Sequence, residues 1–343
     1  MRTPLKSRAE LDRLVAEANA PLTDPAKNRT IGDTDSRFEI YHFALSLCSQ
    51  KVRACLAEKG ASYIAHDINL QLPLLGNYDP AYVRLRLAAN TDARFATSYT
   101  GRSSVATEGF DPAVVPTLVD HGTGEVVVDS LAICRYIDAT FEGTARLVPS
   151  DLESVVLSEL KIVDATPQVA LLYGAHPEVD FRPERIRAGM AGIHDRKIAK
   201  IRTARDLVAD DPDLTAAYDA KIAKEESGKL HVLTPDRMRQ SATETLEIVD
   251  QLDQRLSDGR GWICGSTFTL ADVFWAVSLF RLKWLGMAFA WRGQHVLNST
   301  ERPSVAAYGS RLFDRPAFRA AAIDWPDMPR SEFVADHYGV SDE

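Results

Sequence analysis

The segment from Phe43 to Lys51 carries the strongest chemical signal, because its letters FALSLCSQK combine a thiol with hydroxyl groups. Ser46, Cys48 and Ser49 supply these groups. A cysteine becomes a good nucleophile near neutral pH where its surroundings are electropositive. A free cysteine can also be a small buried packing residue, since it is among the most buried residue types. Position alone leaves both interpretations of Cys48 open.

The elements expected around this segment would place the thiol where it can react. Residues 38–43 alternate apolar and polar side chains and predict a strand, and residues 49–59 predict a helix that ends at Gly60. A helix N-terminus offers free amides and partial positive charge, which stabilise a thiolate. Lys51 and Arg53 would add positive charge if their side chains turn toward Cys48.

The spacing of the cysteines limits the thiol chemistry. The position three residues after Cys48 is Lys51, so no Cys-x-x-Cys motif exists and a disulfide at Cys48 needs an external thiol. The other three cysteines are expected to be packing residues: Cys55, Cys134 and Cys264.

Two dipeptides further along the chain suit a peptide-like ligand. A cis bond between Val115 and Pro116 would turn an edge amide toward a ligand, whereas a trans bond would make Pro116 an ordinary edge proline. Asp129 and Ser130 begin a predicted helix and offer a carboxylate, a hydroxyl and free amides. These groups suit a zwitterionic ligand, and they equally suit plain helix capping.

The remaining motifs are weaker. Tyr173 and His176 interrupt a helical pattern, and either line a substrate pocket or mark a helix end. Residues 269–272 (TLAD) fit a capping box with Asp272 in place of Glu, which is a structural signal. The eight histidines show no ligand spacing, so we predict no metal site. The sequence contains no dinucleotide fingerprint, Walker A motif or nucleophile elbow.

The predicted elements divide the chain into an α/β part and an all-α part. A strand–helix–strand unit is followed by a polar insert at 88–109, then by a hairpin that turns at 121–124 and a helix. Only helical patterns follow, at 155–172, 185–207, 214–224, 235–256, 270–285, 304–312 and 316–323. The expected divisions are an N-terminal extension at 1–37 with one helix at 8–19, an α/β domain at 38–142, a helical domain at 150–325 and a tail at 326–343.

Composition sets broad limits on partners and location. The 343 residues are 45% hydrophobic and 26% charged, as in an ordinary globular protein. A net charge of −8 argues against nucleic-acid binding, which depends on neutralising phosphates. No run of 18 apolar residues and no signal peptide is evident, so we expect no membrane partner. Four cysteines are too few for a disulfide framework, and we expect a reducing cytoplasm.

Together, the motifs resemble the cytosolic glutathione transferases over about residues 37 to 325. The order and spacing match at Ser46/Cys48, Val115-Pro116, Asp129-Ser130 and the 269–272 capping box. The resemblance implies a thioredoxin-like domain followed by an all-helical domain, glutathione as co-substrate and a homodimer. The chain also differs from typical members of the family, because it has an additional N-terminal extension and the additional insert at 88–109.

The resemblance implies a role for each matched residue. Ser46 or Cys48 would face the glutathione sulfur. Val115 and Pro116 would pair with the cysteinyl backbone of glutathione through a cis bond, and an acidic-Ser pair, here Asp129-Ser130, would hold the γ-glutamyl group.

Within the family, residues 43–53 are similar to bacterial reductive dehalogenases of chlorinated hydroquinones. That similarity implies a small aromatic substrate, in a pocket to which Phe43, Tyr173 and His176 contribute. Glutathione would displace chloride, Cys48 would take over the glutathionyl group as a mixed disulfide, and a second glutathione would release it.

Two other hypotheses stay open. The first is a different glutathione transferase reaction, either aryl-ether cleavage or cis–trans isomerisation of a maleylacetoacetate-like acid, in which Ser46 would matter and Cys48 would not. The second is a binding module that keeps only the fold.

Overall fold

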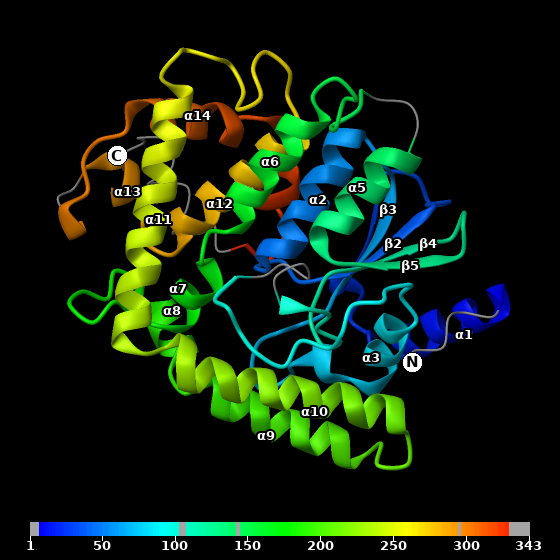
Figure 1. Ribbon diagram of the computed structural model, residues 1–343. Coiled ribbons are helices and arrows are strands. Elements are labelled where there is room, and N and C mark those ends of the chain that lie inside the picture. The colour runs from blue at the N-terminus through cyan, green and yellow to red at the C-terminus, as the bar shows by residue number, and fades with distance from the viewer. Residues whose placement is uncertain (1–6, 103–107, 142–144, 294–295, 329–343) are drawn as a thin grey trace.

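The structure is a computed structural model that describes residues 7–102, 108–141, 145–293 and 296–328. An α/β domain lies beside a helical domain, and the helices α2 and α12 face each other where the two meet (Figure 1). Five stretches lie outside the described residues: 1–6 of the predicted extension, 103–107 of the insert, 142–144 at the end of the predicted α/β domain, 294–295 of the predicted helical domain and 329–343 of the tail.

A five-stranded mixed sheet forms the centre of the α/β domain, in the order β1-β3-β2-β4-β5. Its strands are β1 (Asn28–Ile31), β2 (Phe38–His42), β3 (Tyr63–Asp67), β4 (Thr117–Asp120) and β5 (Glu125–Val128). β2 and β3 run parallel, as the strand–helix–strand pattern predicts, and β4 and β5 form the predicted hairpin. The thioredoxin-like and helical architecture predicted from the sequence is confirmed.

Alternate residues of β2 face different helices, as the strand period of two requires. Ile40 packs with α2 (Leu47–Lys59) and α5 (Ser130–Thr140) on one face of the sheet. Tyr41 packs with α1 (Arg8–Asn19) and α3 (Pro80–Leu87) on the other. The sheet is therefore covered on both sides.

The N-terminal extension is built into this domain. The predicted helix at 8–19 is α1, which buries Leu11, Leu14 and Ala18 on one side. The sequence analysis did not predict β1, which pairs antiparallel with β3 at the edge of the sheet. The letters NRTI show no apolar alternation and none of the strand's residues is fully buried, so the usual strand signal is missing.

The second domain is helical, as predicted, but two expected helices are broken. The predicted helix at 155–172 is two helices separated by Pro167, and the one at 185–207 is broken at Gly192, whose φ is 62°. The predicted helix at 316–323 is one helical turn followed by a π-helical turn at 319–323. The helices are α6 (Glu153–Asp164), α7 (Gln168–Tyr173), α8 (Glu184–Met190), α9 (Ile193–Asp206), α10 (Pro212–Ser227), α11 (Pro235–Leu256), α12 (Leu270–Trp284), α13 (Phe289–Arg292), α14 (Pro303–Phe313) and α15 (Pro316–Phe318).

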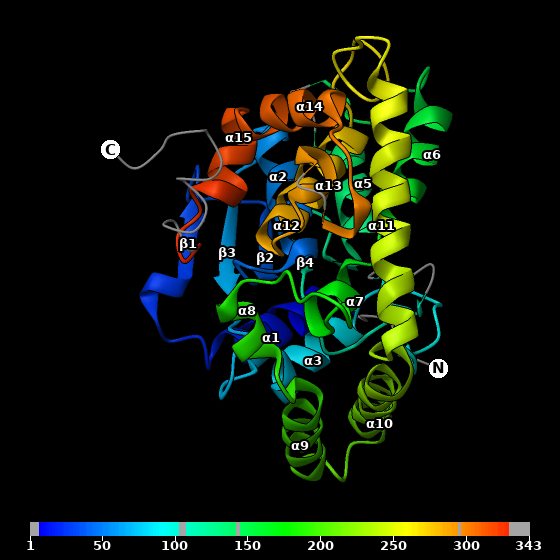
Figure 2. The ribbon, with the colours of Figure 1, turned by 90° about the vertical axis from the view of Figure 1, so that its left-hand side faces the viewer.

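Two features of the helical domain position the site. The buried helix α12 begins at the predicted capping box and packs against α2 and α6. The helices α9 and α10 form an antiparallel pair that extends from the rest of the domain (Figures 1 and 2).

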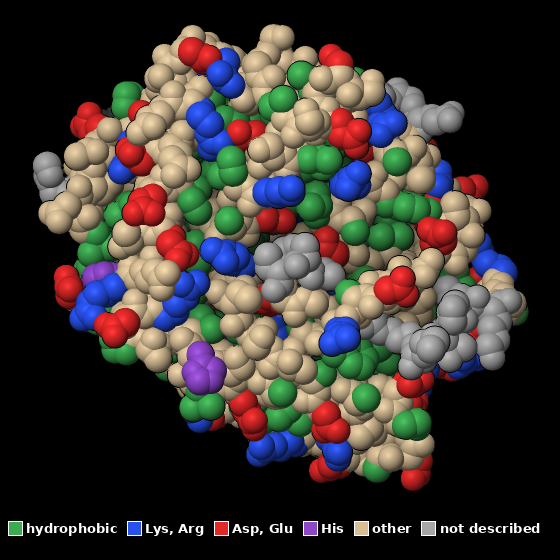
Figure 3. Space-filling view, in the orientation of Figure 1, with side chains coloured by type: hydrophobic (Ala, Val, Ile, Leu, Met, Phe, Trp, Pro, Cys, Tyr) green, Lys and Arg blue, Asp and Glu red, His purple; other side chains and the backbone are tan. Residues whose placement is uncertain are grey.

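Within the described residues, no helix combines the length and apolar character needed to cross a membrane. Acidic and basic side chains are interspersed over the face shown in Figure 3.

Candidate active site

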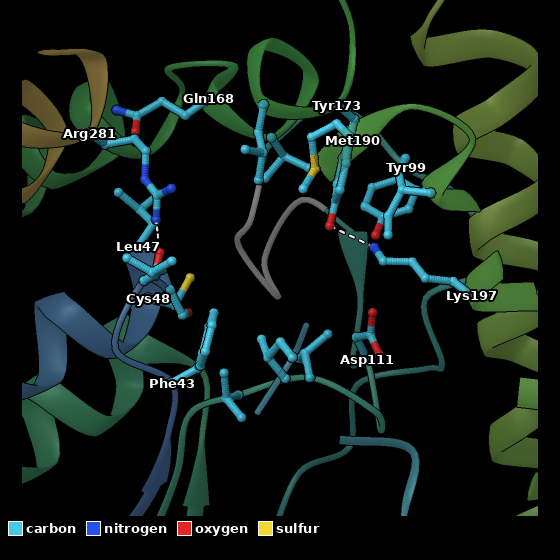
Figure 4. Close-up of a pocket in the computed structure, with 18 of the residues that line it drawn as sticks. Phe43, Leu47, Cys48, Tyr99, Asp111, Gln168, Tyr173, Met190, Lys197 and Arg281 are labelled. Atoms are coloured by element: carbon cyan, nitrogen blue, oxygen red, sulfur yellow. Dashed lines mark hydrogen bonds between the residues drawn. The ribbon is translucent and has the colours of Figure 1, made fainter. Parts of the chain in front are cut away.

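A cavity of about 550 Å³ lies between the two domains and collects most of the residues that the sequence singled out. Its walls include, from that set, Phe43, Ser46, Cys48, Val115, Pro116, Asp129, Ser130 and Tyr173. Cys48 and Arg281 lie on one side of the cavity in Figure 4, and Tyr173, Tyr99 and Lys197 lie on the other.

Cys48 lies inside the first turn of α2. The helix begins at Leu47, two residues earlier than predicted, because the Ser46 side chain accepts a hydrogen bond from the Ser49 amide (3.3 Å) and acts as the N-cap. Cys48 is half-buried and lines the cavity, whereas the other three cysteines are buried, as expected: Cys55, Cys134 and Cys264. The thiol therefore lies at the positive end of a helix and on the cavity wall.

The loop that precedes Cys48 is held by side chains of α2. The Ser49 hydroxyl accepts from the Phe43 amide (3.2 Å), and Gln50 donates to the carbonyl of Ala44 (3.3 Å). Arg53 donates to the carbonyls of Phe43 and Ala44, at 3.3 and 3.0 Å. These bonds fix the backbone of the loop that leads into Cys48.

The structure places Arg53 and Lys51 differently with respect to Cys48. Arg53 is absent from the cavity wall and is occupied by the loop carbonyls. The buried Lys51 ammonium pairs with Asp164 on α6 (2.5 Å). Burial works to lower the pKa of Lys51, but attraction to Asp164 and then to Cys48 raises it overall. Lys51 thus contributes positive charge near Cys48 without lining the cavity.

Arg281 is a charged residue of the cavity wall that the sequence analysis missed. It comes from α12, lines the cavity, and donates to the Leu45 carbonyl in the loop before Cys48 (Figure 4). Burial lowers the pKa of Arg281 to about 10, and attraction to Cys48 opposes that shift. Its guanidinium lies 4.5 Å from the centre of the Trp284 ring. The signal was present, since Arg281 interrupts an apolar helix and a buried charge there needs a partner.

Val115 and Pro116 lie on the cavity wall, and the peptide bond between them is cis. The Pro116 carbonyl accepts from the buried Arg86 guanidinium (2.6 Å), which also donates to Thr117 Oγ1 (2.8 Å) at the start of β4.

Asp129 caps α5 and also lines the cavity. Its carboxylate accepts from the amides of Leu131 and Ala132, both at 3.0 Å. Asp129 is therefore the N-cap of α5, which is one of the two functions expected for it from the sequence. Asp129 has a φ of 75°, which is uncommon outside glycine and is found preferentially where ligands bind. Ser130 is the first residue of the helix and is buried at the same wall.

Tyr173 and His176 have different surroundings. Tyr173 lines the cavity, and its hydroxyl accepts from Lys197 on α9 (2.6 Å). His176, which the sequence analysis also placed in the pocket, is not among the residues that line this cavity. The chain leaves the wall where α7 ends at Gly174, and His176 Nδ1 instead accepts from the Glu178 amide (3.3 Å) in a turn. Across the described ranges, no three His, Cys, Asp or Glu residues gather as a metal site would require.

Comparison with known proteins decides the family. Residues 45–140 match the model of the glutathione S-transferase N-terminal domain, and residues 235–308 match that of the C-terminal domain. A 2,5-dichlorohydroquinone reductive dechlorinase from Sphingobium indicum is 44% identical over 313 residues, covering 90% of this chain and 89% of the relative. The chain belongs to the glutathione S-transferase family.

More distant relatives agree with this assignment. A tetrachloro-p-hydroquinone reductive dehalogenase from Sphingobium chlorophenolicum is 26% identical over 83% of this transferase and 95% of the relative. Among solved structures, the β-etherase of Sphingobium sp. strain SYK-6 superposes with a TM-score of 0.53 at 17% identity, covering 83% of this chain and 98% of the etherase. That likeness shows the shared fold. The helices α6 to α10 fall between the two family models.

Proposed function

We propose that this glutathione S-transferase removes chlorine reductively from a chlorinated hydroquinone, with Cys48 taking over the glutathionyl group. The observation that carries the proposal is a half-buried thiol at a helix N-terminus, on the wall of a cavity that also holds Pro116 and Asp129. The 44% identity to a 2,5-dichlorohydroquinone reductive dechlorinase supports the choice of substrate.

The cavity walls fit glutathione. The Val115–Pro116 edge would bind its cysteinyl backbone, and Asp129 with Ser130 at the start of α5 would hold its γ-glutamyl group.

The first stage replaces chlorine by sulfur. Ser46 would hydrogen-bond the attacking glutathione thiolate, which adds to a ring carbon of the substrate's ketone tautomer and forms a C–S bond. Chloride leaves with the electron pair of the C–Cl bond, and the products are a glutathionyl hydroquinone and HCl.

The second stage is reductive. The Cys48 thiolate would attack the sulfur of the conjugate, forming an S–S bond as the C–S bond breaks. The ring carbon keeps that electron pair and takes a proton, so the hydroquinone is reduced while the two sulfurs are oxidised. A second glutathione exchanges with the mixed disulfide, frees Cys48 and leaves as oxidised glutathione.

Chloride release tests the proposal. Wild-type enzyme with glutathione should release one chloride and form one oxidised glutathione for each chlorohydroquinone consumed. Cys48→Ser should still release chloride but stop at the glutathionyl conjugate. Unchanged formation of the dechlorinated hydroquinone by Cys48→Ser contradicts the proposal. Cleavage of a lignin-type aryl ether by both enzymes, with no chloride released, would favour ether cleavage instead.

The family also leads us to propose a homodimer in the cytoplasm. Light scattering during size-exclusion chromatography tests the first part, and a mass close to that of a single chain contradicts it. Fractionation of cells tests the second.

A further inference from the structure

The end of the cavity opposite Cys48 has a chemistry of its own. It is built from Tyr173 at the end of α7 and from Lys197 on α9, with Tyr99 beside them (Figure 4). Tyr173 and Lys197 lie between the two family models, whereas Tyr99 lies within the stretch matched by the N-terminal model.

Lys197 holds the Tyr173 hydroxyl in one orientation. The Lys197 ammonium donates to Tyr173 Oη at 2.6 Å, and the charge lies 4.2 Å from the centre of the same ring. A tyrosine hydroxyl has one hydrogen and accepts through its lone pairs. Lys197 occupies a lone pair, and no acceptor for the Tyr173 hydrogen lies among the described residues. That hydrogen is therefore available to a molecule in the cavity.

Lys197 is fixed from behind by a buried carboxylate. Glu225 on α10 lies 3.5 Å from the Lys197 ammonium and also accepts from Tyr99 (3.1 Å) and His194 (2.7 Å). Lys221 lies 3.1 Å from the same carboxylate. Although burial opposes the charged form, attraction to Glu225 and then to Tyr173 raises the pKa of Lys197. Lys197 is thus a charged donor at neutral pH.

Between the two ends, the walls are suited to a flat ring. Leu172, Ile186, Met190 and Ile193 add apolar surface beside Tyr173. A hydroquinone has oxygens at opposite ends of an apolar ring. When a ring carbon faces the sulfur chemistry at Cys48, one oxygen points toward the other wall.

We propose that the Tyr173 hydroxyl donates a hydrogen bond to the ring oxygen of the substrate farthest from Cys48, and that Lys197 is its positioning residue. This inference rests on the proposed function for the identity of the substrate. The Tyr173 hydroxyl can donate to that oxygen in either form, as a hydroxyl or as the carbonyl of the ketone tautomer. Selectivity for a ring with two opposed oxygens therefore comes from α7 and α9.

Binding without turnover tests the inference. Calorimetry with S-methylglutathione present compares hydroquinone, which has no chlorine to lose, with p-xylene, which has the same shape and no oxygen. Wild-type enzyme should prefer hydroquinone. Tyr173→Phe should reduce that preference about tenfold, the scale of one hydrogen bond from a polarised donor. If Tyr173 had only a structural role, its replacement would weaken the binding of hydroquinone and p-xylene equally.

Lys197 variants provide the second measurement. Lys197→Met should lower the preference several-fold, and Lys197→Arg should restore part of it. Lys229→Met is the matched control, because Lys229 is an exposed lysine in the turn that follows α10 and pairs with the exposed Asp195. An unchanged preference in both Tyr173→Phe and Lys197→Met overturns the inference, as does wild-type enzyme that does not bind hydroquinone.

The two proposals fail in different ways. Hydroquinone binding that depends on Tyr173, without chloride release from any chlorohydroquinone, contradicts the proposed function alone. Chloride release with a preference that is independent of Tyr173 contradicts this inference alone.

Discussion

Cys48 and Arg281 show how far single residues can be interpreted from sequence. The position of Cys48 at a helix start could be predicted locally, because a thiol beside an N-cap serine is a short-range pattern. Arg281 reaches the same loop from the other domain, and helical periodicity cannot tell which buried charge meets which loop. Lys197 was missed for the same reason, since its partner Tyr173 lies on a different helix.

Arg281 should increase the reactivity of Cys48. Replacing Arg281 with Gln removes a buried positive charge that attracts the thiolate. We expect alkylation of Cys48 by iodoacetamide at pH 7 to slow several-fold, measured by peptide mass spectrometry. Arg135→Gln, an exposed arginine on α5, is the control and should leave the rate unchanged. An equal rate in Arg281→Gln would show that the guanidinium serves only the loop.

Asp67 at the end of β3 should limit stability above neutral pH. Burial raises its pKa from 3.8 to about 6, and Oδ2 has no partner among the described residues. The folded state therefore holds its proton more tightly than the unfolded state. The free energy of unfolding should fall as the pH rises from about 4 to about 6, and this penalty remains at higher pH.

Asp67→Asn should remove that penalty. We expect the variant to be more stable than wild type by about 1–3 kcal/mol at pH 8, with no gain below pH 4, measured by urea unfolding. Asp12→Asn is the matched exposed control. A variant that is less stable than wild type at pH 8 would show that the Asp67 charge is favourable in the folded protein.

Among the helices and strands, features fixed by neighbouring residues could be predicted from the sequence, whereas features fixed by distant pairing could not. The αL conformation of Gly60 ends α2, and the turn at 121–124 joins β4 to β5, as predicted. Both are fixed by residues close in sequence. β1 depends on pairing with β3, and its four residues carry no pattern of their own. The breaks at Pro167 and Gly192 could have been found from the residue types.

The capping box of α12 should be a main support of the helical domain. Asp272 is buried and accepts from the amides of Thr269 (2.8 Å) and Ile263 (2.9 Å) and from the Tyr308 hydroxyl (2.6 Å). Asp272→Ala leaves these donors buried and unpaired, so we expect a loss of about 3 kcal/mol by urea unfolding. Asp272→Asn should lose less. A loss below about 1 kcal/mol for the alanine variant would contradict this account.

For the whole molecule, the α9–α10 pair completes the cavity while bridging the two domains. Its apolar side packs on the α/β domain, where Tyr218 donates to the Tyr78 carbonyl (2.8 Å). Lys221 lies 2.7 Å from Asp111 and 3.1 Å from Glu225, all buried. Helical patterns predicted both helices, but this docking joins distant segments and could not be predicted from periodicity.

Removing one charge should loosen this contact. Lys221→Met removes the cation that Asp111 and Glu225 share. Lys224 remains beside Asp111 (3.2 Å) and Lys197 beside Glu225 (3.5 Å), so the cost should be smaller than the about 3–5 kcal/mol typical of an uncompensated buried charge. We expect faster amide hydrogen exchange in α9 and α10 and little change in α2. Lys221→Met with Asp111→Asn should recover part of the protection. Uniformly faster exchange across the protein would contradict a local docking role.

The proposed function depends on the exchange of sulfur partners between Cys48 and glutathione. Enzyme quenched with acid during turnover of a chlorohydroquinone, then digested and analysed by mass spectrometry, tests it most directly. We predict one glutathionyl group on Cys48 that dithiothreitol removes, and none on the other three cysteines, which are buried: Cys55, Cys134 and Cys264. Continued dechlorination with no adduct on Cys48 at any time point would contradict the proposed exchange.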